Sequence, residues 1–324
     1  MLGMARSCLT NRDIPPKMLG LSRPSVRKEM HGPTSAAFFE MKILFATDLH
    51  GSEPHFARLT AVAGEVRPDV VVLGGDMLPD DSALDRANMG KGQPSWVRNQ
   101  FRGIAAGIKS ATGGKPILTV FGNHDWGSSV TAMKELAAES LVGILDLTTP
   151  AIIDGVTFLG YSSTPPTPWF VKDFERLDMP GDSPPLLGGA RWDARFNRPS
   201  MLSAETLFNT RSTMKEELAD LTAPAGIWVW VAHCPPHASK LDQYHGNHSW
   251  GSKAVREALE RLQPHLSLHG HIHESPSVTG AIRDAFGRTV AVNPGQTRSV
   301  LHYAVIDFDA ADGTVGDVRH GQRA

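Results

Sequence analysis

The sequence predicts one large α/β domain built around parallel strands, and three observations lead to that prediction. Short apolar runs rich in β-branched residues alternate with segments whose apolar residues recur at three- and four-residue spacing. Several of these runs end at glycine, where a buried strand can turn sharply. The chain has 324 residues, 41% hydrophobic and 20% charged, which suffices for one large domain or two modest ones.

The first crossover is predicted from three consecutive segments. Residues 41–47 form a continuous apolar run, which is typical of a buried strand. A helical pattern follows from Pro54, and residues 69–73 form a second buried strand that stops at Gly74 and Gly75. A strand, a helix and a strand over this length predict a right-handed unit with parallel strands.

The same alternation continues through the rest of the chain. Residues 77–94 are polar and rich in Asp and Gly, which predicts a loop. Alternating apolar residues in the tail predict antiparallel strands. In chain order we expect a helix at 96–108, a strand at 116–121, a helix at 130–141, a hairpin at 151–160, a helix from Ser203 to Leu221, a strand at 227–232, a loop at 235–250, a helix at 252–262, a strand at 266–268, and tail strands that include Val278, Ile282, 289–292 and 302–308.

Residues 162–200 break this alternation. They are rich in proline and contain several aromatic and arginine side chains. Long irregular segments in a compact domain are usually functional or disordered, and the aromatic content argues against disorder. We therefore expect an ordered insertion beside the active face, with solvated arginines. We expect the aromatic side chains of this insertion to pack in its core and not to stack on a bound base. These side chains are Trp169, Phe170, Trp192 and Phe196.

The first 40 residues differ in composition from the rest of the chain. Residues 1–40 mix basic residues, proline, serine and glycine without a period, and they lack the apolar core of a secretory signal. We expect them to be disordered or a non-native extension, with Met41 able to serve as the natural start; a transit peptide is the alternative. Residues 41–324 are expected to form a single domain.

Charge, hydropathy and cysteine content restrict the partners. The formal net charge is -2, so no overall basic field favours nucleic acid as a partner. The longest apolar runs, such as 227–232, are shorter than the roughly 20 residues that span a bilayer, so no membrane is expected. The two cysteines, Cys8 and Cys234, exclude a disulfide framework and predict a cytoplasmic protein. The oligomeric state is left open.

Polar clusters follow five of the apolar runs, each at the carboxyl end of its run. Ligands bind at that edge of open α/β sheets, so we expect the clusters to converge. If the first strand continues, Asp48 and His50 share one face and can bind a cation together. The clusters contain Asp48 and His50; Asp76; Asn123, His124 and Asp125; His233; and His271 and His273.

The donor atoms of these clusters predict metal ions. Carboxylate and amide oxygens combined with imidazole nitrogens suit Mn, Fe or Zn better than Ca or Mg, which prefer oxygen alone. The carboxylate of Asp76 can bridge two ions, and His271 and His273 can serve one ion each. Two ions roughly 3.5–4 Å apart can hold a hydroxide and clamp a phosphate for in-line displacement. The pattern thus predicts a two-metal site that attacks a phosphate ester.

In order and approximate spacing, these clusters resemble the calcineurin-like metallophosphoesterases. The resemblance covers roughly residues 41–308. It implies a four-layer α/β/β/α sandwich of that type, with two mixed sheets flanked by helices. It also implies metal-dependent hydrolysis of a small phosphate ester at a dinuclear centre, with a metal-bridging hydroxide as the nucleophile.

The same resemblance implies a role for each residue of the site. His124 would bind no metal; it would face the phosphate and either protonate the leaving oxygen or stabilise charge in the transition state. Asp76 would bridge the two ions. The first ion would be bound by Asp48, His50 and His273, and the second by Asn123, His233 and His271.

Three stretches resemble one branch of that superfamily, the branch of the animal brain metallophosphoesterase-domain proteins. They are residues 164–169, 233–236 and 268–274. In some animal members glycine replaces the first histidine of the last stretch, but this chain has His271 there. A complete dinuclear site is therefore expected, and the branch favours phosphodiesters, including cyclic nucleotides.

The sequence also permits other functions for this chain. The chain could be a phosphomonoesterase or protein phosphatase, or a non-catalytic scaffold that binds metal; a DNA nuclease is disfavoured because no basic stripe is evident. Among the remaining residues, we expect Asp125 to position its loop, His269 to pack, Cys234 to be inert, and His245 and His248 to be solvated.

Overall fold

The computed structural model describes residues 40–81, 85, 88–245 and 248–324. These described residues belong to one compact unit. The expectation of a disordered or non-native extension at residues 1–40 therefore lies outside the described residues, apart from Glu40, whose backbone begins the first strand.

The first sheet has six strands in a mixed arrangement. Four neighbouring strands, β1 to β4, are parallel, as the predicted crossover requires. The last two strands of the chain then add to the free edge of β1 in antiparallel orientation. In spatial order the strands are β16 (Val315–Arg323), β15 (Leu301–Asp309), β1 (Glu40–Ala46), β2 (Val70–Leu73), β3 (Ile117–Thr119) and β4 (Gly143–Ile144).

The second sheet also has six strands and is mixed. Its four inner strands are parallel, and both edge strands are antiparallel to their neighbours. The spatial order is β13 (Arg283–Phe286), β14 (Thr289–Val292), β12 (Leu266–Leu268), β9 (Trp228–Ala232), β6 (Val156–Tyr161) and β5 (Ala151–Ile153).

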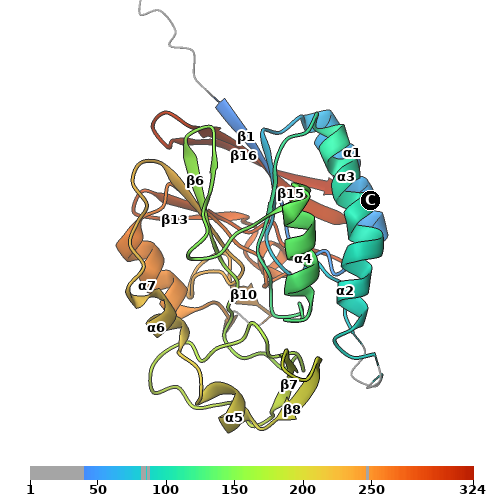
Figure 1. Cartoon of the computed structure of the whole chain (residues 1–324). Helices are drawn as coiled ribbons and strands as arrows, with labels where there is room; N and C mark the ends of the chain where they lie inside the picture. Colours follow the sequence, from blue (N-terminus) through green and yellow to red (C-terminus); the bar gives the residue numbers. More distant parts are fainter. Residues whose placement is uncertain (1–39, 82–84, 86–87, 246–247) are drawn as a thin grey trace, which may run out of the picture. The chain divides into compact units, whose positions relative to one another are not determined.

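The two sheets pack face to face, and helices cover their outer faces (Figure 1). Alternate residues of each strand supply the layer between the sheets, for example Phe45, Val72 and Phe158. The other face of the first sheet packs on α1 (Glu53–Val66), α3 (Arg102–Ala111) and α4 (Ser129–Ala138). The other face of the second sheet packs on α6 (Met214–Ala219) and α7 (Lys253–Leu262). The predicted four-layer α/β/β/α sandwich is confirmed.

The prediction of one helix from Ser203 to Leu221 is wrong. The segment holds α5 (Ala204–Phe208) and, after a break, α6. Thr213 starts the second helix with a capping box: its hydroxyl accepts from the backbone N–H of Glu216, and the Glu216 carboxylate accepts from the backbone N–H of Thr213. The amphipathic pattern carried across the break and concealed it.

Other boundaries also differ from the prediction. Helix begins within the predicted 77–94 loop, because α2 (Gly92–Trp96) and a π-helical turn, η1 (Val97–Phe101), lead directly into α3. Val278 belongs to α8 (Ser275–Thr279) and not to a strand. The sequence reasoning also missed β4, β13 and β16, which are very short or largely exposed, so they carry little hydrophobic signal.

The segment at 162–200 contains the hairpin strand β7 (Gly189–Asp193), and its partner β8 (Arg198–Leu202) runs just past it. As predicted, the segment's Trp169, Phe170 and Trp192 pack against a small core that includes Trp126. For Phe196 the prediction is wrong, because this residue is 57% exposed at the hairpin turn. The guanidinium carbons of Arg195 and Arg198 lie 5.2 and 5.6 Å from the centre of its ring.

The arginines of the segment also differ from the expectation that all are solvated. The guanidinium of Arg176 is mostly buried, and its Nε lies 2.7 Å from a carboxylate oxygen of Glu217. The predicted loop at 235–250 contains two short paired strands, β10 (Gln243–Tyr244) and β11 (His248–Ser249).

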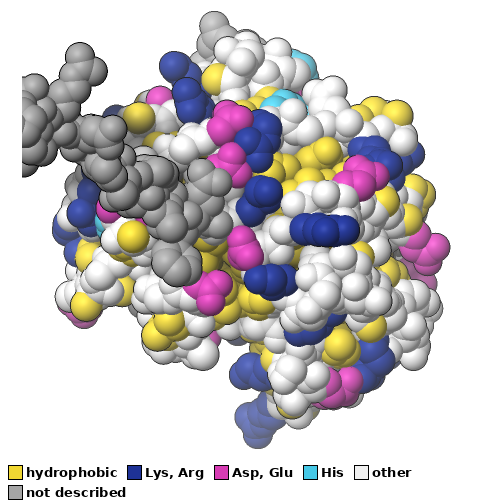
Figure 2. All heavy atoms as spheres, turned by 90° about the horizontal axis from the view of Figure 1, so that it is seen from above, with side chains coloured by type: hydrophobic (Ala, Val, Ile, Leu, Met, Phe, Trp, Pro, Cys, Tyr) yellow, Lys and Arg dark blue, Asp and Glu magenta, His cyan; other side chains and the backbone are white. Residues whose placement is uncertain are grey.

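Two further observations concern the surface charges and the length of the helices. Figure 2 looks down on the molecule from above the view of Figure 1, and on this face Lys and Arg side chains lie among Asp and Glu side chains, so neither sign of charge dominates it. Within the described ranges, every helix is too short or too polar to cross a bilayer.

Candidate metal centre

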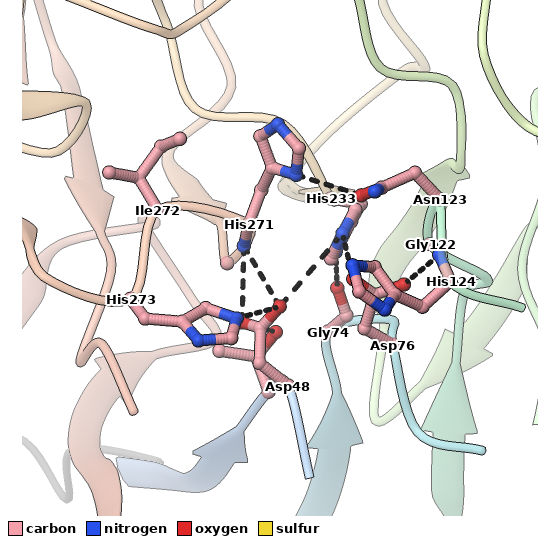
Figure 3. Close-up of polar contacts among 12 residues, drawn as sticks. Asp48, Gly74, Asp76, Gly122, Asn123, His124, His233, His271, Ile272 and His273 are labelled. Atoms are coloured by element: carbon pink, nitrogen blue, oxygen red, sulfur yellow. Dashed lines mark hydrogen bonds and ion pairs between the residues drawn. The ribbon is translucent and has the colours of Figure 1, made fainter. Parts of the chain in front are cut away.

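The loops that follow β1, β2, β3, β9 and β12 meet at one edge of the sandwich (Figure 3). Both sheets present the carboxyl ends of parallel strands there, which is why residues far apart in sequence come together. The structure gathers all seven side chains that the sequence singles out as ligands, namely Asp48, His50, Asp76, Asn123, His233, His271 and His273.

The backbone brings Asp48 and His50 together in a different way from the one expected. β1 ends at Ala46, and both residues have left-handed backbone conformations with φ of 56° and 45°. They therefore do not share a strand face. Instead, the backbone N–H groups of Asp48 and His50 donate to the carbonyls of Gly75 and Asp76, so two adjacent loops interlock.

Glycine is required where the loops approach most closely. A Cβ atom on Gly122 would lie 2.2 Å from a carboxylate oxygen of Asp76, and one on Gly75 would lie 2.5 Å from Nδ1 of His233. Gly75 also has a φ of +99°, which L side chains rarely adopt. These glycines therefore permit the carboxylate and the imidazole to reach the centre.

The first group of candidate ligands contains Asp48, His50 and His273, whose nearest donor atoms lie within 4.8 Å of one another. A carboxylate oxygen of Asp48 is 3.2 Å from Nε2 of His273. The other Asp48 oxygen accepts from the Thr47 hydroxyl at 2.7 Å. These contacts fix the carboxylate and match the set that the resemblance assigns to the first ion.

The second group contains Asp76, His233 and His271. Nε2 of His233 lies 3.3 Å from a carboxylate oxygen of Asp76 and 3.9 Å from one of Asp48, so it faces both carboxylates. Asn123 completes the group, because its Oδ1 is 2.8 Å from Nδ1 of His271. The other Asp76 oxygen accepts from the backbone N–H of His124 at 2.7 Å, which fixes the carboxylate beside His233.

Two imidazole nitrogens in these groups have the surroundings of metal ligands. Nδ1 of His233 donates to the carbonyl of Gly74 at 2.8 Å, and Nδ1 of His50 is 3.1 Å from Asp80. The Nε2 atoms of both rings are buried and have no hydrogen-bond partner among the described residues. Buried polar atoms are rarely left unpaired, and a ligand histidine usually donates its second N–H to an oxygen. The residues therefore fit a pair of divalent cations.

The electrostatics of the centre favour a cation. Burial opposes ionisation of Asp48, but His273 lowers the pKa of its carboxyl to about 2, and His233 likewise holds the pKa of buried Asp76 well below its usual range. Although burial disfavours charge, Asp76 raises the pKa of His233 to about 9 and Asp48 raises that of His273 to about 8. In the metal-free protein, the protons on these two imidazoles supply the positive charge that a bound cation would supply.

His271 behaves differently from the other two. Burial, together with the neighbouring His233, lowers the pKa of His271 to about 3, so its imidazole is neutral at physiological pH. A neutral imidazole presents a lone pair, which is the form that binds metal. Its backbone N–H donates to both oxygens of Asp48 at 3.1 Å. This contact connects the loop after β12 to the loop after β1.

Asp80 is a site residue that the sequence reasoning missed. One of its carboxylate oxygens lies 2.8 Å from Nδ1 of His124 and 3.1 Å from Nδ1 of His50. Burial opposes its ionisation, but these two histidines hold the pKa of Asp80 well below its usual range. It lies in the predicted 77–94 loop, where it is one of several aspartates and nothing in the sequence distinguishes it.

His124 itself lies beside the metal groups, between Asp80 and Trp169. The ring of Trp169 stacks on that of His124, with centroids 4.3 Å apart and planes 15° apart. A buried ion pair anchors the tryptophan's loop: Nζ of Lys172 lies 2.8 Å from the Glu175 carboxylate and donates to the carbonyl of Trp169. The insertion thus supplies one wall of the site.

Five other residues that the sequence analysis considers lie outside the two ligand groups. Asp125 accepts from the backbone N–H groups of Gly122 and Leu78, which confirms that it positions its loop. His269 is buried and bonded to Ser267 and to backbone carbonyls, as a packing residue should be. Burial raises the pKa of the Cys234 thiol well above its usual value, and His245 and His248 are exposed.

Two cavities open onto this centre and share one boundary. The larger, of about 570 Å³, is lined by Asp48, His50, Asp80 and residues 296–298, among others. The smaller, of about 280 Å³, is lined by Asp76, Asn123, Trp169 and His271, among others. The shared boundary consists of His124, His273 and Glu274. The metal groups therefore face space on two sides.

Comparison with known proteins agrees with this geometry. The family model described as "Calcineurin-like phosphoesterase" matches residues 41–275. The UPF0046 protein K07C11.7 of Caenorhabditis elegans is 32% identical over 93 residues, which are 27% of this chain and 31% of the worm protein. The chain thus matches about a third of the length of that relative.

Solved structures share the fold at low sequence identity. One crystal structure has a TM-score of 0.58 at 15% identity, covering 88% of this chain and all of the other. The structure of TT1561 from Thermus thermophilus has a TM-score of 0.51 at 13% identity, covering 87% of this chain and 98% of the other. At these identities the likeness concerns the fold alone.

Proposed function

We propose that this chain, which belongs to the family of calcineurin-like phosphoesterases, hydrolyses phosphodiesters with the help of two divalent metal ions. Family membership makes it a phosphoric ester hydrolase, and the proposal concerns its ions and its substrates. The observation that carries the proposal is the pair of adjacent ligand groups around Asp48 and Asp76, with two buried imidazole nitrogens that make no hydrogen bond to the described residues.

The residues of the centre would hold the two ions as follows. Asp48, His50 and His273 would bind one ion, Asn123, His233 and His271 would bind the other, and Asp76 would bridge them. This mixture of oxygen and nitrogen donors suits Mn, Fe or Zn, and we propose Mn as the first ion to test. When bound, the ions would supply an activated water nucleophile and offset the charge of the phosphate.

His124 would act on the leaving group. Its Nδ1 donates to Asp80, which leaves Nε2 as the atom that can meet the substrate. In the protonated imidazole, Nε2 can donate its proton to the leaving oxygen as the bond from phosphorus to that oxygen breaks. Asp80 holds the ring orientation through Nδ1, and Trp169 covers one face of the ring.

A diester is favoured over a monoester by the two cavities that meet at His124 and His273. A phosphate at the metal groups has space for a substituent on either side. A monoester needs only one such space, so a phosphomonoesterase or protein phosphatase is the alternative. Cyclic nucleotides are diesters of suitable size for the test, and the resemblance to the animal branch also favours them.

The proposal is tested with protein loaded with Mn²⁺. The substrate panel compares 2′,3′- and 3′,5′-cyclic nucleotides and bis(p-nitrophenyl) phosphate with p-nitrophenyl phosphate. We expect higher kcat/KM for the diesters, and we expect Asp76→Ala to abolish turnover. A preference for the monoester would favour the alternative. Inactivity toward every ester would support a non-catalytic scaffold. A cytoplasmic location stays a prediction.

A further inference from the structure

The larger cavity contains a cation that the proposed reaction does not use. Arg298 lines this cavity together with the candidate ligands Asp48, His50 and His273. Its side chain is exposed to solvent. The position is therefore open to a substrate whose phosphate lies at the metal groups.

The turn that presents Arg298 is held on both sides. The carbonyl of Thr297 accepts a 2.7 Å hydrogen bond from Nε2 of His55, a buried residue. The Gln296 side chain donates to the carbonyl of Thr47, directly before Asp48, and accepts from the backbone of Thr297. The two residues directly before Arg298 are thereby held next to the first metal group, which favours a defined binding role for Arg298.

The guanidinium of Arg298 has no ionic partner among the described residues. This distinguishes it from arginines whose guanidinium is neutralised by a nearby carboxylate, namely Arg98, Arg102, Arg176, Arg256, Arg319 and Arg323. Three acids line the same cavity, and two of them are engaged: Asp48 with His273, and Asp80 with His124. The third, Glu274, lies on the boundary with the smaller cavity.

We propose that Arg298 binds a second anionic group of the substrate, a phosphate monoester carried on the arm of the diester that occupies the larger cavity. Arginine presents several N–H donors in a planar fork that matches two oxygens of a phosphate. The cavity of about 570 Å³ falls within the roughly 300–1,000 Å³ typical of small-molecule sites, which is large enough for a nucleotide-sized arm. A 3′,5′-cyclic nucleotide has a single phosphate and would leave Arg298 unused.

This inference rests on the proposed function, because it assumes a diester at the metal groups. The test uses two chromogenic substrates that differ only in the second anion: thymidine 5′-(p-nitrophenyl phosphate) and the same compound with a 3′-phosphate. In both, a water oxygen forms a bond to the 5′-phosphorus, and p-nitrophenolate leaves with the electrons of the broken P–O bond. With Mn²⁺, we expect about tenfold higher kcat/KM for the 3′-phosphorylated substrate, mainly through a lower KM.

The variant Arg298→Gln should reduce this preference to about onefold while leaving turnover of the unphosphorylated substrate nearly unchanged. Arg298→Lys should keep part of it, because the charge remains and the fork is lost. Arg283→Gln is the matched control, since Arg283 is exposed on β13 and does not line the cavity. Equal kcat/KM for the two substrates in the wild type, or a preference that survives in Arg298→Gln, would overturn the inference.

A binding measurement separates this inference from the proposed function. Calorimetry with Mn²⁺-loaded protein compares thymidine 3′,5′-bisphosphate with thymidine 5′-monophosphate. We expect the bisphosphate to bind about tenfold more tightly to the wild type and with no such advantage to Arg298→Gln. If neither chromogenic substrate is hydrolysed but this difference appears, the proposed reaction fails while the Arg298 subsite stands. If the difference is absent, the subsite fails whatever the turnover.

Discussion

One carboxylate oxygen of Asp80 lies 2.8 Å from Nδ1 of His124 and 3.1 Å from Nδ1 of His50. A single side chain therefore orients both the residue that we propose as the acid and a candidate metal ligand. Because both contacts are made through Nδ1, both rings keep Nε2 for chemistry. Asp80 thus connects a candidate metal ligand, His50, to the residue that we propose acts on the leaving group, His124.

Replacing Asp80 by asparagine should impair turnover more than metal binding. The amide keeps the shape but loses the charge that orients His124, so we expect kcat to fall about 10- to 100-fold, as is usual when such supporting partners are removed. Stopped assays with Mn²⁺ and a metal content determination measure the two effects. Asp85→Asn, at an exposed aspartate of the same loop, is the control. Unchanged kcat in Asp80→Asn would remove Asp80 from the account.

Trp169 is expected to position His124 through stacking. The substitution Trp169→Ala removes a ring whose centroid is 4.3 Å from that of the imidazole. Such ring contacts contribute roughly 0.5–1.5 kcal/mol, so we expect kcat/KM to fall about 2- to 10-fold. Trp169→Phe should restore much of the loss because a ring is still present. If Phe is no better than Ala, the tryptophan acts through something other than stacking.

The buried pair of Lys172 and Glu175 is expected to stabilise the insertion. Both side chains are almost fully buried, and Nζ of Lys172 also donates to the Thr167 carbonyl. Removing one partner of a buried ion pair typically costs about 3–5 kcal/mol, so Lys172→Ala should lower the unfolding free energy by about 3 kcal/mol. Denaturant unfolding measures it. The exposed pair of Arg98 and Glu135 provides the comparison, and Arg98→Ala should have little effect.

The pH dependence of the metal-free protein follows from His233 and His273. Their pKa values of about 9 and about 8 exceed the ordinary 6.5, because Asp76 and Asp48 favour the charged imidazoles. This stabilisation is complete below about pH 6.5 and is lost as pH rises through the two folded-state pKa values. The Tm of metal-free protein should therefore fall from pH 7 to 9. Metal-free Asp76→Asn should show a weaker fall.

Metal affinity should change in the opposite direction over the same range. An ion must displace the protons of His233 and His273, so the apparent affinity for Mn²⁺ should rise as pH increases from 6.5 to 8.5. Calorimetric titration at several pH values measures this. An affinity that is flat or falls with pH would mean that these imidazoles do not lose protons on binding.

The sandwich and the convergence of the candidate ligands could be predicted because both leave strong marks in the sequence. Buried parallel strands are continuous apolar runs, as in Val70–Leu73, and a cluster of donors follows five of them. The ordered donors, Asp48 through His273, then indicate the metal chemistry. These side chains gather because the carboxyl ends of parallel strands from both sheets lie at one edge of the sandwich. The order of strands and helices along the chain predicts such an edge.

The remaining features depend on tertiary contacts that no local pattern encodes. The left-handed backbone of Asp48 and His50 arises from hydrogen bonds to a loop about 25 residues further along the chain, so strand periodicity misled the expectation of a shared face. Asp80 sits in a polar loop, where an acid carries no special signal. The break before Thr213 is concealed by apolar spacing that continues across it.

The number of metal ions bound per chain, measured together with turnover, tests the central claim most directly. Wild-type protein and His233→Ala are loaded with Mn²⁺, dialysed, analysed for metal content and assayed with bis(p-nitrophenyl) phosphate. We predict two ions per chain and turnover in the wild type, and about one ion with at least a 100-fold loss of turnover in His233→Ala. A wild type that saturates at a single ion, or a singly loaded His233→Ala protein with full activity, would contradict a dinuclear centre.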